Sequence, residues 1–283
     1  MTNPRGRVLI INNNEFHDVH GETSYRDGSE HDVKHLQEMF DHLHFEVETR
    51  ENLTSKEMLE SVESVTQDRR MEDYGMFALV IMSHGQENDQ ISGSDFNSIK
   101  LDDVYFLLSS QRFRHMAGKP KMVIVQACAG FLKDFGEQHD NRLGAVSQVI
   151  DAQHLGPFQR VNFTESRTVP FKDPTTSDRT IKYLSMDDLI VIKASFNMYA
   201  SMRDAKGDQG SFLISNLVYG FYKHSHDTDI ESLFKLIREN VASQTKDLAS
   251  KFPKSCYGQM PFAFNTLTRQ RKLYLFPGYH GEA

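Results

Sequence analysis

Two short motifs place a histidine and a cysteine directly after runs of apolar residues. Ser83-His84-Gly85 follows the run from Phe77 to Met82, and Gln126-Ala127-Cys128 follows the run from Met122 to Val125. Short apolar runs of this kind are typical of buried strands, so we expect both side chains at the same edge of one sheet. A thiolate is a nucleophile, and a neighbouring imidazole can take the thiol proton and later donate it to a leaving amine. The pair therefore indicates a minimal acyl-transfer site.

Each of these residues has a simpler interpretation when it is taken alone. A lone cysteine after an apolar strand is commonly a small packed hydrophobe, and a lone histidine is commonly structural or solvated. Both motifs, however, follow strands and carry a nearby glycine, Gly85 or Gly130, which lets a substrate backbone approach closely. The pairing therefore favours chemistry over packing.

The composition is that of an ordinary globular protein. With 283 residues, 39% of them hydrophobic, the chain can bury a substantial core as one domain or a closely joined pair. A net charge of −7 gives no support to a nucleic-acid partner. The two cysteines, Cys128 and Cys256, and the lack of a charged opening followed by a long apolar stretch argue against a disulfide-stapled secreted domain and against a membrane protein. We expect a reduced thiol and a location in the cytosol or nucleus.

Strand-like and helix-like patterns alternate along the chain. The apolar run Arg7–Asn12 ends in an asparagine-rich turn, and Val33, Leu36, Phe40 and Leu43 then recur at helical spacing. Later patterns predict strands at Leu189–Ala194 and Leu273–Phe276 and helices at Ser211–Tyr222 and Ile230–Val241. This alternation predicts a parallel sheet with crossover helices.

The stretch from about Phe131 to Ser185 breaks the rhythm with glycines, prolines and polar residues. A connection of that length is usually functional or disordered, and it divides the chain into a larger front part and a smaller back part. The thirteen histidines include His31 and His35 at i,i+4 spacing. They lack further ligands at an interpretable spacing, so we expect no metal and no other cofactor.

The ordered motifs resemble the protease domain of animal caspases over nearly the whole chain. Gln126-Ala127-Cys128-Ala129-Gly130 matches the caspase signature Q-A-C-[RQG]-G except at Ala129, and His84 precedes Cys128 at close to the separation of about 50 residues that the signature has. The other matching segments are Ile10–Asn13, Arg26–Asp32, Asn52–Thr54, Gly118–Lys121, Tyr199–Arg203, Gly210–Phe212 and Gln259–Pro261.

The resemblance implies an α/β fold, a three-layer sandwich in which a six-stranded, mainly parallel sheet carries helices on both faces. It implies a large subunit over residues 1–140 with the histidine and cysteine, a cleaved linker over 141–178 and a small subunit over 179–283. Two copies are expected to dimerise through the back part and continue the sheet. The run Leu273–Pro277 is expected to be a strand near that interface or an ordinary edge strand.

The implied activity is that of an aspartate-directed cysteine endopeptidase, made as a zymogen and acting in apoptosis or related proteolytic signalling. By the same resemblance, Cys128 attacks the peptide carbonyl and His84 is the acid–base group. The backbone N–H groups of Gly85 and Cys128 hold the oxyanion, each donor typically contributing about 3 kcal/mol.

The resemblance also implies a pocket for the substrate aspartate. Arg26 and Arg203 supply planar cationic forks, which suit a carboxylate better than lysine does, and Gln126 is the third member. The segment that includes Tyr199, Ser201 and Met202 is expected to pair with the substrate as an added strand.

Several departures from the family pattern keep a second interpretation open. Ala129 replaces the usual arginine, glutamine or glycine, Ala200 and Met202 stand where aromatic residues are usual, and the loop Asp204–Gln209 is about two residues longer than is common in the family. These differences favour a weakly active or inactive homologue that regulates another caspase by binding. A relative that cuts after lysine or arginine is disfavoured, because paired arginines suit an anionic side chain.

Processing and partners follow from the same resemblance. Asp151, which the small Ala152 follows, is the preferred processing site, with Asp140 and Asp178 as further candidates. The short stretch ahead of Arg7 resembles that of the short-prodomain effector type, and a short form of a longer protein would look the same. The expected partners are proteins with aspartate at the cut, a second copy of the chain, and an upstream activator or caspase inhibitor, with neither nucleic acid nor membrane.

Overall fold

The computed structural model describes residues 4–17, 23–86, 88–127, 186–195, 210–251, 259–267 and 272–275. All of them belong to one compact unit, which residues 1–132 and 184–283 form. The expected linker, residues 141–178, lies outside the described residues.

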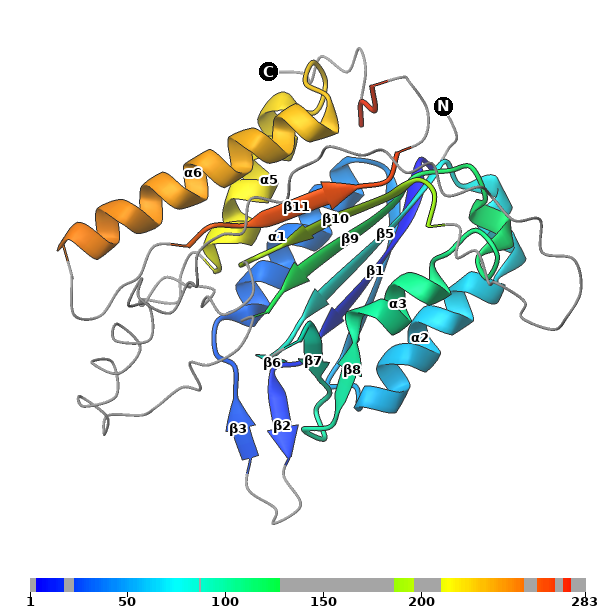
Figure 1. Cartoon of the computed structure of the whole chain (residues 1–283), viewed down its shortest axis with the longest axis horizontal. Helices are drawn as coiled ribbons and strands as arrows, with labels where there is room; N and C mark the ends of the chain where they lie inside the picture. The colour runs from blue at the N-terminus through cyan, green and yellow to red at the C-terminus, as the bar shows by residue number, and fades with distance from the viewer. Residues whose placement is uncertain are drawn as a thin grey trace, which may run out of the picture. The chain divides into compact units, whose positions relative to one another are not determined.

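The unit is built on a six-stranded sheet with the strand order β11-β10-β9-β5-β1-β4 (Figure 1). Its members are β1 (Gly6–Asn12), β4 (Phe45–Glu51), β5 (Met76–Met82), β9 (Lys121–Gln126), β10 (Leu189–Lys193) and β11 (Phe262–Asn265). Five strands run parallel, and β11 pairs antiparallel to β10. Strands β1, β5, β9 and β10 are buried along their whole length. The centre of each is a run of apolar residues, as is typical of strands that are buried on both faces. The expected α/β sheet is confirmed.

Two smaller sheets lie at the end toward which the parallel strands point (Figure 1). One is the antiparallel pair β2 (Glu15–His17) and β3 (Thr23–Tyr25), and the other contains β6 (Gly85–Gln86), β7 (Gln90–Ser92) and β8 (Ser98–Lys100). The first of these sheets follows β1 in the chain and the second follows β5. Both therefore lie at the carboxyl edge of the main sheet.

Helices cover both faces of the main sheet, as the resemblance implies. The helices among the described residues are α1 (Ser29–His42), α2 (Ser55–Gln67), α3 (Leu101–Leu107), α5 (Phe212–His224) and α6 (Ile230–Lys251), with short 3-10 turns η1 (Arg69–Asp73) and η2 (Arg114–Met116). Helix α2 starts at a capping box, in which Thr54 and Glu57 bond each other's backbone N–H, an arrangement that satisfies two otherwise unpaired donors.

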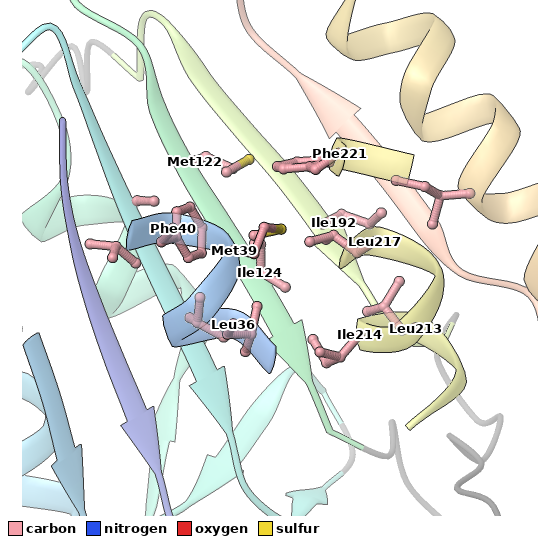
Figure 2. Packing of buried hydrophobic residues seen from close by; sticks show 14 of the residues in the cluster. Leu36, Met39, Phe40, Met122, Ile124, Ile192, Leu213, Ile214, Leu217 and Phe221 are labelled. Carbon is pink, nitrogen blue, oxygen red and sulfur yellow. The ribbon is translucent and has the colours of Figure 1, made fainter. Parts of the chain in front are cut away.

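One face of the sheet packs against α1, α5 and α6 (Figure 2). Strand residues alternate between the faces, so Ile10 belongs to this core while Leu9 and Ile11 belong to the core beneath α2 and α3. Burial of each large side chain contributes roughly 1.5–3 kcal/mol. Residues of the first core that Figure 2 labels are Leu36, Met39, Phe40, Met122, Ile124, Ile192, Leu213, Ile214, Leu217 and Phe221.

The predicted strand at Leu273–Phe276 is wrong for its described residues, because residues 273–275 form no strand. The sheet takes β11 instead, whose residues pair with Ile190–Lys193 of β10. The carbonyl of Leu273 accepts the Ile230 N–H at 2.9 Å, and the carbonyl of Leu275 accepts from Arg5 Nη1 at 3.3 Å. The segment therefore ties the start of α6 to the chain before β1.

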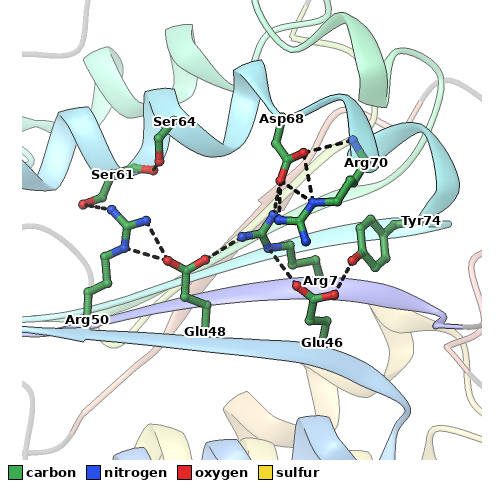
Figure 3. Close-up of polar contacts among 9 residues, drawn as sticks. All are labelled: Arg7, Glu46, Glu48, Arg50, Ser61, Ser64, Asp68, Arg70 and Tyr74. Atoms are coloured by element: carbon green, nitrogen blue, oxygen red, sulfur yellow. Dashed lines mark hydrogen bonds and ion pairs between the residues drawn. The ribbon is translucent and has the colours of Figure 1, made fainter.

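A charged cluster ties β1 and β4 to the end of α2 (Figure 3). The side chain of Arg7 is 9% exposed and lies 2.7 Å from Glu48 Oε2 and 2.7 Å from Asp68 Oδ2. Arg50 bonds Glu48 and the Ser61 hydroxyl, so the carboxylates have several partners. No local sequence pattern predicts this cluster, because Arg7 is 41 residues from Glu48 and 61 residues from Asp68.

Candidate active site

His84 stands where β5 ends and the smaller β6-β7-β8 sheet begins. Its carbonyl accepts the Ser92 N–H at 2.9 Å, and the preceding Ser83 Oγ donates to the Ser92 carbonyl at 2.6 Å. The half-buried imidazole lies against Phe16 of β2, with ring centroids 4.5 Å apart and planes inclined by 44°. Backbone pairing on one side and an aromatic ring on the other thus hold the histidine. Gly85 follows it as the first residue of β6, paired with Ile91.

Gln126 ends β9, the strand next to β5. The register pairs Met82 with Gln126, and the Ser83 N–H donates to the Gln126 carbonyl at 3.3 Å. The chain therefore leaves both strands side by side at the same edge of the sheet. Gln126 is 1% exposed and Ala127 is 7% exposed. Cys128, the next residue, lies outside the described residues.

Arg26 joins this edge from the loop between β3 and α1. Its backbone N–H donates to the Asn14 carbonyl at 2.7 Å, and its Nη1 donates to the Asn13 carbonyl at 3.2 Å. Asn13 follows β1, the other neighbour of β5, and its own N–H donates to the Met82 carbonyl at 2.8 Å. The structure thus brings Arg26, His84 and Gln126 to the carboxyl ends of three adjacent strands.

The buried side chain of Asn13 connects segments of the chain at this edge, a role that the sequence did not indicate. It is 0% exposed, its Nδ2 donates to the Leu53 carbonyl at 3.0 Å, and its Oδ1 accepts the Leu53 N–H at 2.9 Å. A buried amide must find such partners. No local sequence pattern indicates this contact, because Asn13 and Leu53 lie 40 residues apart in the chain.

The expected substrate-binding segment is anchored on both sides of residues 196–209. Before it, the Ala194 carbonyl accepts from Gln259 Nε2 at 2.7 Å. After it, the Ser211 N–H donates to Asp32 Oδ1 of α1 at 2.7 Å. Gly210 has φ +71, and a Cβ there would lie 2.3 Å from Asp32 Oδ1. Glycine is therefore required at this anchor.

The turn between β7 and β8 also borders the site. Asp95 Oδ1 accepts the Ser55 N–H at the start of α2 at 3.0 Å, and the Ser94 carbonyl accepts the His17 N–H of β2 at 2.8 Å. Burial raises the pKa of Asp95, but hydrogen bonds from Asn97 and Ser55 outweigh it and lower that pKa below its ordinary value. The carboxylate therefore stays ionised and holds the turn to α2.

An ion pair links β10 to the turn before β7. Lys193, which is 7% exposed at the end of β10, pairs with Asp89. The pair ties the strand that leads into residues 196–209 to the small sheet that begins after His84. Sequence reasoning had no signal for it, because the two residues are far apart in the chain.

Several expected site residues lie outside the described residues. They are the nucleophile Cys128, the substrate-binding residues Tyr199, Ser201, Met202 and Arg203, the processing candidates Asp140, Asp151 and Asp178, and the departures Ala129 and Ala200. Their roles stay predictions.

The described part of the chain shows neither a metal-binding cluster nor a membrane-spanning helix. Among its residues, no group of three histidine, cysteine, aspartate or glutamate side chains is placed to hold a metal ion. No helix within it combines the length and apolar character needed to cross a membrane.

Comparison with known proteins gives consistent matches. A family model of the caspase domain matches residues 5–272. Cell death protein 3 of Caenorhabditis remanei is 28% identical over 258 residues, which are 89% of this chain and 48% of that protein. Human caspase-9 is 27% identical over 94% of this chain and 61% of its own length, and caspase-3 of Bos taurus is 27% identical over 94% of this chain and 83% of its own.

The coverage of these relatives differs. The chain spans about half of cell death protein 3 and about three fifths of caspase-9. The family model nevertheless extends over nearly the whole chain, and the six-stranded sheet has the architecture that the resemblance implies. The chain belongs to the caspase family.

Proposed function

We propose that the chain is an aspartate-directed cysteine endopeptidase acting in apoptosis or a related proteolytic signal. The observation that carries the proposal is the junction of β5 and β9. There Met82 pairs with Gln126, and the sequence puts His84 two residues beyond the first and Cys128 two residues beyond the second. Membership of the caspase family and similarity to a relative named for cell death support the same conclusion.

In this mechanism the sulfur of Cys128 attacks the carbonyl carbon of the scissile bond. His84 takes the thiol proton and donates it to the leaving amine, and then activates the water that releases the acyl group. The developing oxyanion is held by the N–H groups of Gly85 and Cys128. The Ser92 and Phe16 contacts of His84 support the role, because a general base must be held in one orientation.

The pocket for the substrate aspartate is formed by Arg26, Gln126 and Arg203. Arg26 and Gln126 come to one edge of the sheet, and the contacts of Asp32 and Gln259 anchor the segment that contains Arg203. A bidentate guanidinium bond to a carboxylate is strong and directional, so asparagine in place of the aspartate is expected to lose recognition.

We extend the proposal to maturation and location. The chain is made as a zymogen and cut in the linker 141–178 or at its borders, with Asp151 preferred over Asp140 and Asp178. Removal of the whole linker leaves a large subunit of residues 1–140 and a small subunit of residues 179–283. Its substrates and any activator or inhibitor meet it in the cytosol or nucleus. Mass spectrometry of fully active protein tests the cleavage, and a single unbroken chain from residue 1 to residue 283 would contradict it.

The proposed assembly is a homodimer that continues the sheet. Its support is the position of β11, which is an edge strand of the sheet in the described part of the chain. An edge strand exposes N–H and C=O groups that another strand can pair with. Sedimentation equilibrium of cut and uncut protein tests this, and a monomer in both forms would contradict it.

The decisive experiment measures hydrolysis of fluorogenic tetrapeptides that end in aspartate. The purified protein is compared with Cys128→Ala and with Cys256→Ala, the matched control at the only other cysteine. We expect activity that Cys128→Ala abolishes, that Cys256→Ala retains, and that is lost when asparagine replaces the substrate aspartate.

The second candidate function is a regulatory homologue that binds another caspase and cuts little. Ala129, Ala200 and Met202, together with the longer loop 204–209, favour it. No turnover at high enzyme concentration, even after an active caspase has cut the linker, would contradict the protease and support this alternative. Partner binding would then be the activity to measure.

A further inference from the structure

Phe96, in the turn between β7 and β8, has an unusual backbone. Its φ is 57°, in the left-handed region that bulky side chains rarely adopt. The residue is nevertheless 41% exposed. Strain of this kind persists only where the surroundings impose it, and it clusters at functional sites.

The surroundings of Phe96 do impose the conformation. The Gly93 N–H donates to the Asn97 carbonyl at 2.7 Å, and the Phe96 N–H donates to the Gly93 carbonyl at 3.1 Å. The Ser94 N–H donates to the Leu53 carbonyl at 2.8 Å, which ties the turn to the chain before α2. These hydrogen bonds therefore hold the turn, and with it the backbone of Phe96, in one conformation.

The ring of Phe96 is linked to His84 through one other ring. Phe96 and Phe16 have ring centroids 5.5 Å apart at 41°, and Phe16 and His84 have centroids 4.5 Å apart at 44°. Phe16 is 0% exposed, so Phe96 supplies the exposed end of this aromatic row. An apolar surface thus starts next to the imidazole.

A histidine that protonates the leaving amine must come within hydrogen-bond reach of it. The residues that follow the scissile bond therefore pass close to His84 and to the aromatic row. We propose that Phe96 binds an apolar side chain in one of the first two substrate residues after the cut. The inference rests on the proposed protease function. It adds a preference for the substrate residues after the cut, which the aspartate pocket does not contact.

The test uses three internally quenched peptides with one common sequence up to and including the aspartate. After the cut they carry Gly-Gly, Leu-Gly or Gly-Leu. Selectivity is the ratio of kcat/KM for the better leucine peptide to that for the Gly-Gly peptide. For the wild-type protein we expect a ratio of about ten, the scale of discrimination that an apolar contact provides.

Phe96→Gly removes the ring at a φ that glycine adopts freely, and we expect it to bring the ratio close to one. Phe96→Tyr keeps the ring and is expected to keep the preference. Tyr219→Ala, which removes another exposed aromatic ring (51% exposed) on α5, is the matched control and is expected to leave the ratio at the wild-type value.

The outcomes separate the inference from the function on which it rests. If Phe96→Gly slows all three peptides alike, the ring only packs against Phe16 and the inference is overturned. A wild-type protein that cuts the three peptides equally also overturns it, while the protease function stands. A wild-type protein that cuts none of them, before or after linker cleavage, overturns both.

Discussion

Strand β1 has a buried polar side chain near each end, and the two side chains are held in different ways. At the amino end, Arg7 of β1 lies between the side-chain carboxylates of Glu48 and Asp68, at 2.7 Å from each (Figure 3). At the carboxyl end of the same strand, the Asn13 side chain bonds the main chain of Leu53 in both directions. The buried side chain at the amino end of β1 is thus paired with charges, and the one beyond its carboxyl end is bonded to backbone.

The difference separates stability from function within one sheet. The cluster around Arg7 satisfies its charges internally and borders no predicted site residue. The carboxyl end holds its loops through backbone contacts and keeps half-buried side chains there, such as His84 and Arg26. It also includes a strained residue, Phe96. Substitutions at the two ends should therefore affect different measurements.

The largest expected effect is on activity, at His84. His84→Ala removes the general acid–base group, so kcat/KM for an aspartate peptide should fall by about 10²- to 10⁴-fold. Thermal unfolding should change little, because the imidazole is half-buried and its backbone contacts remain. A variant that keeps its activity, or that loses activity only through unfolding, would contradict the separation.

The largest expected effect on stability is at Arg7. Arg7→Met leaves Glu48 and Asp68 without their buried cation, and the loss of one partner of such a pair costs about 3 kcal/mol. This is the lower end of the usual range, because the carboxylates are 26% and 21% exposed. Urea unfolding measures the loss, while kcat/KM of the folded protein should stay at the wild-type value.

Arg70→Met is the matched control for this variant. Arg70 also pairs with Asp68, at 2.8 Å, but its side chain is 63% exposed. Water screens an exposed pair of this kind, so its loss should destabilise the protein much less than the loss of Arg7. Equal losses for the two arginines would show that burial does not set the strength of the cluster.

Two glycines with the same backbone angle sharpen the comparison. Gly118 and Gly210 both have φ 71, but Gly118 precedes β9 at the amino end and Gly210 borders the expected substrate-binding segment. Either change to alanine introduces backbone strain, about 1 kcal/mol at Gly118 and about 2 kcal/mol at Gly210, where the new Cβ would also meet Asp32. Only Gly210→Ala should lower kcat/KM. Equal activity in the two variants would mean that the Asp32 anchor does not position the site.

Sequence patterns predicted the parts of the fold that bury apolar surface on their own. The strands β5, β9 and β10 are continuous apolar runs, and α5 and α6 follow the periodicity of Ser211–Tyr222 and Ile230–Val241. Strand β4 was not predicted, because Glu46, Glu48 and Arg50 interrupt it at an edge. The choice of β11 over Leu273–Phe276 depends on pairing with β10, which no local pattern records.

The site shows the same division. Because parallel strands deliver their carboxyl ends to one edge, the motifs at His84 and Gln126 could be placed together from sequence. The contacts of Asn13, Asp32 and Lys193 could not, since each joins segments far apart in the chain. The left-handed backbone of Phe96 was also unpredictable, because a bulky residue such as phenylalanine rarely adopts a positive φ.

The smallest expected effect is the pH dependence of the Arg7 cluster. Hydrogen bonds from Arg70, with a further one from Arg7, hold the pKa of Asp68 below its ordinary 3.8. Burial raises the pKa of Glu48, but hydrogen bonds from Arg7 and Arg50 outweigh it and lower that pKa below its ordinary 4.5. The folded protein therefore binds these protons more weakly than the unfolded chain does.

The stabilisation from both carboxylates is thus fully present above the ordinary pKa values and is lost as the pH falls through the lowered ones. Between pH 5 and pH 3 the Tm of the wild-type protein should fall further than that of Arg7→Met, by about 2 °C. Because part of each carboxylate is exposed, added salt should reduce this difference in Tm between the two proteins. Parallel curves of Tm against pH for the wild-type protein and Arg7→Met would mean that Arg7 stabilises the sheet by packing and not by its charge.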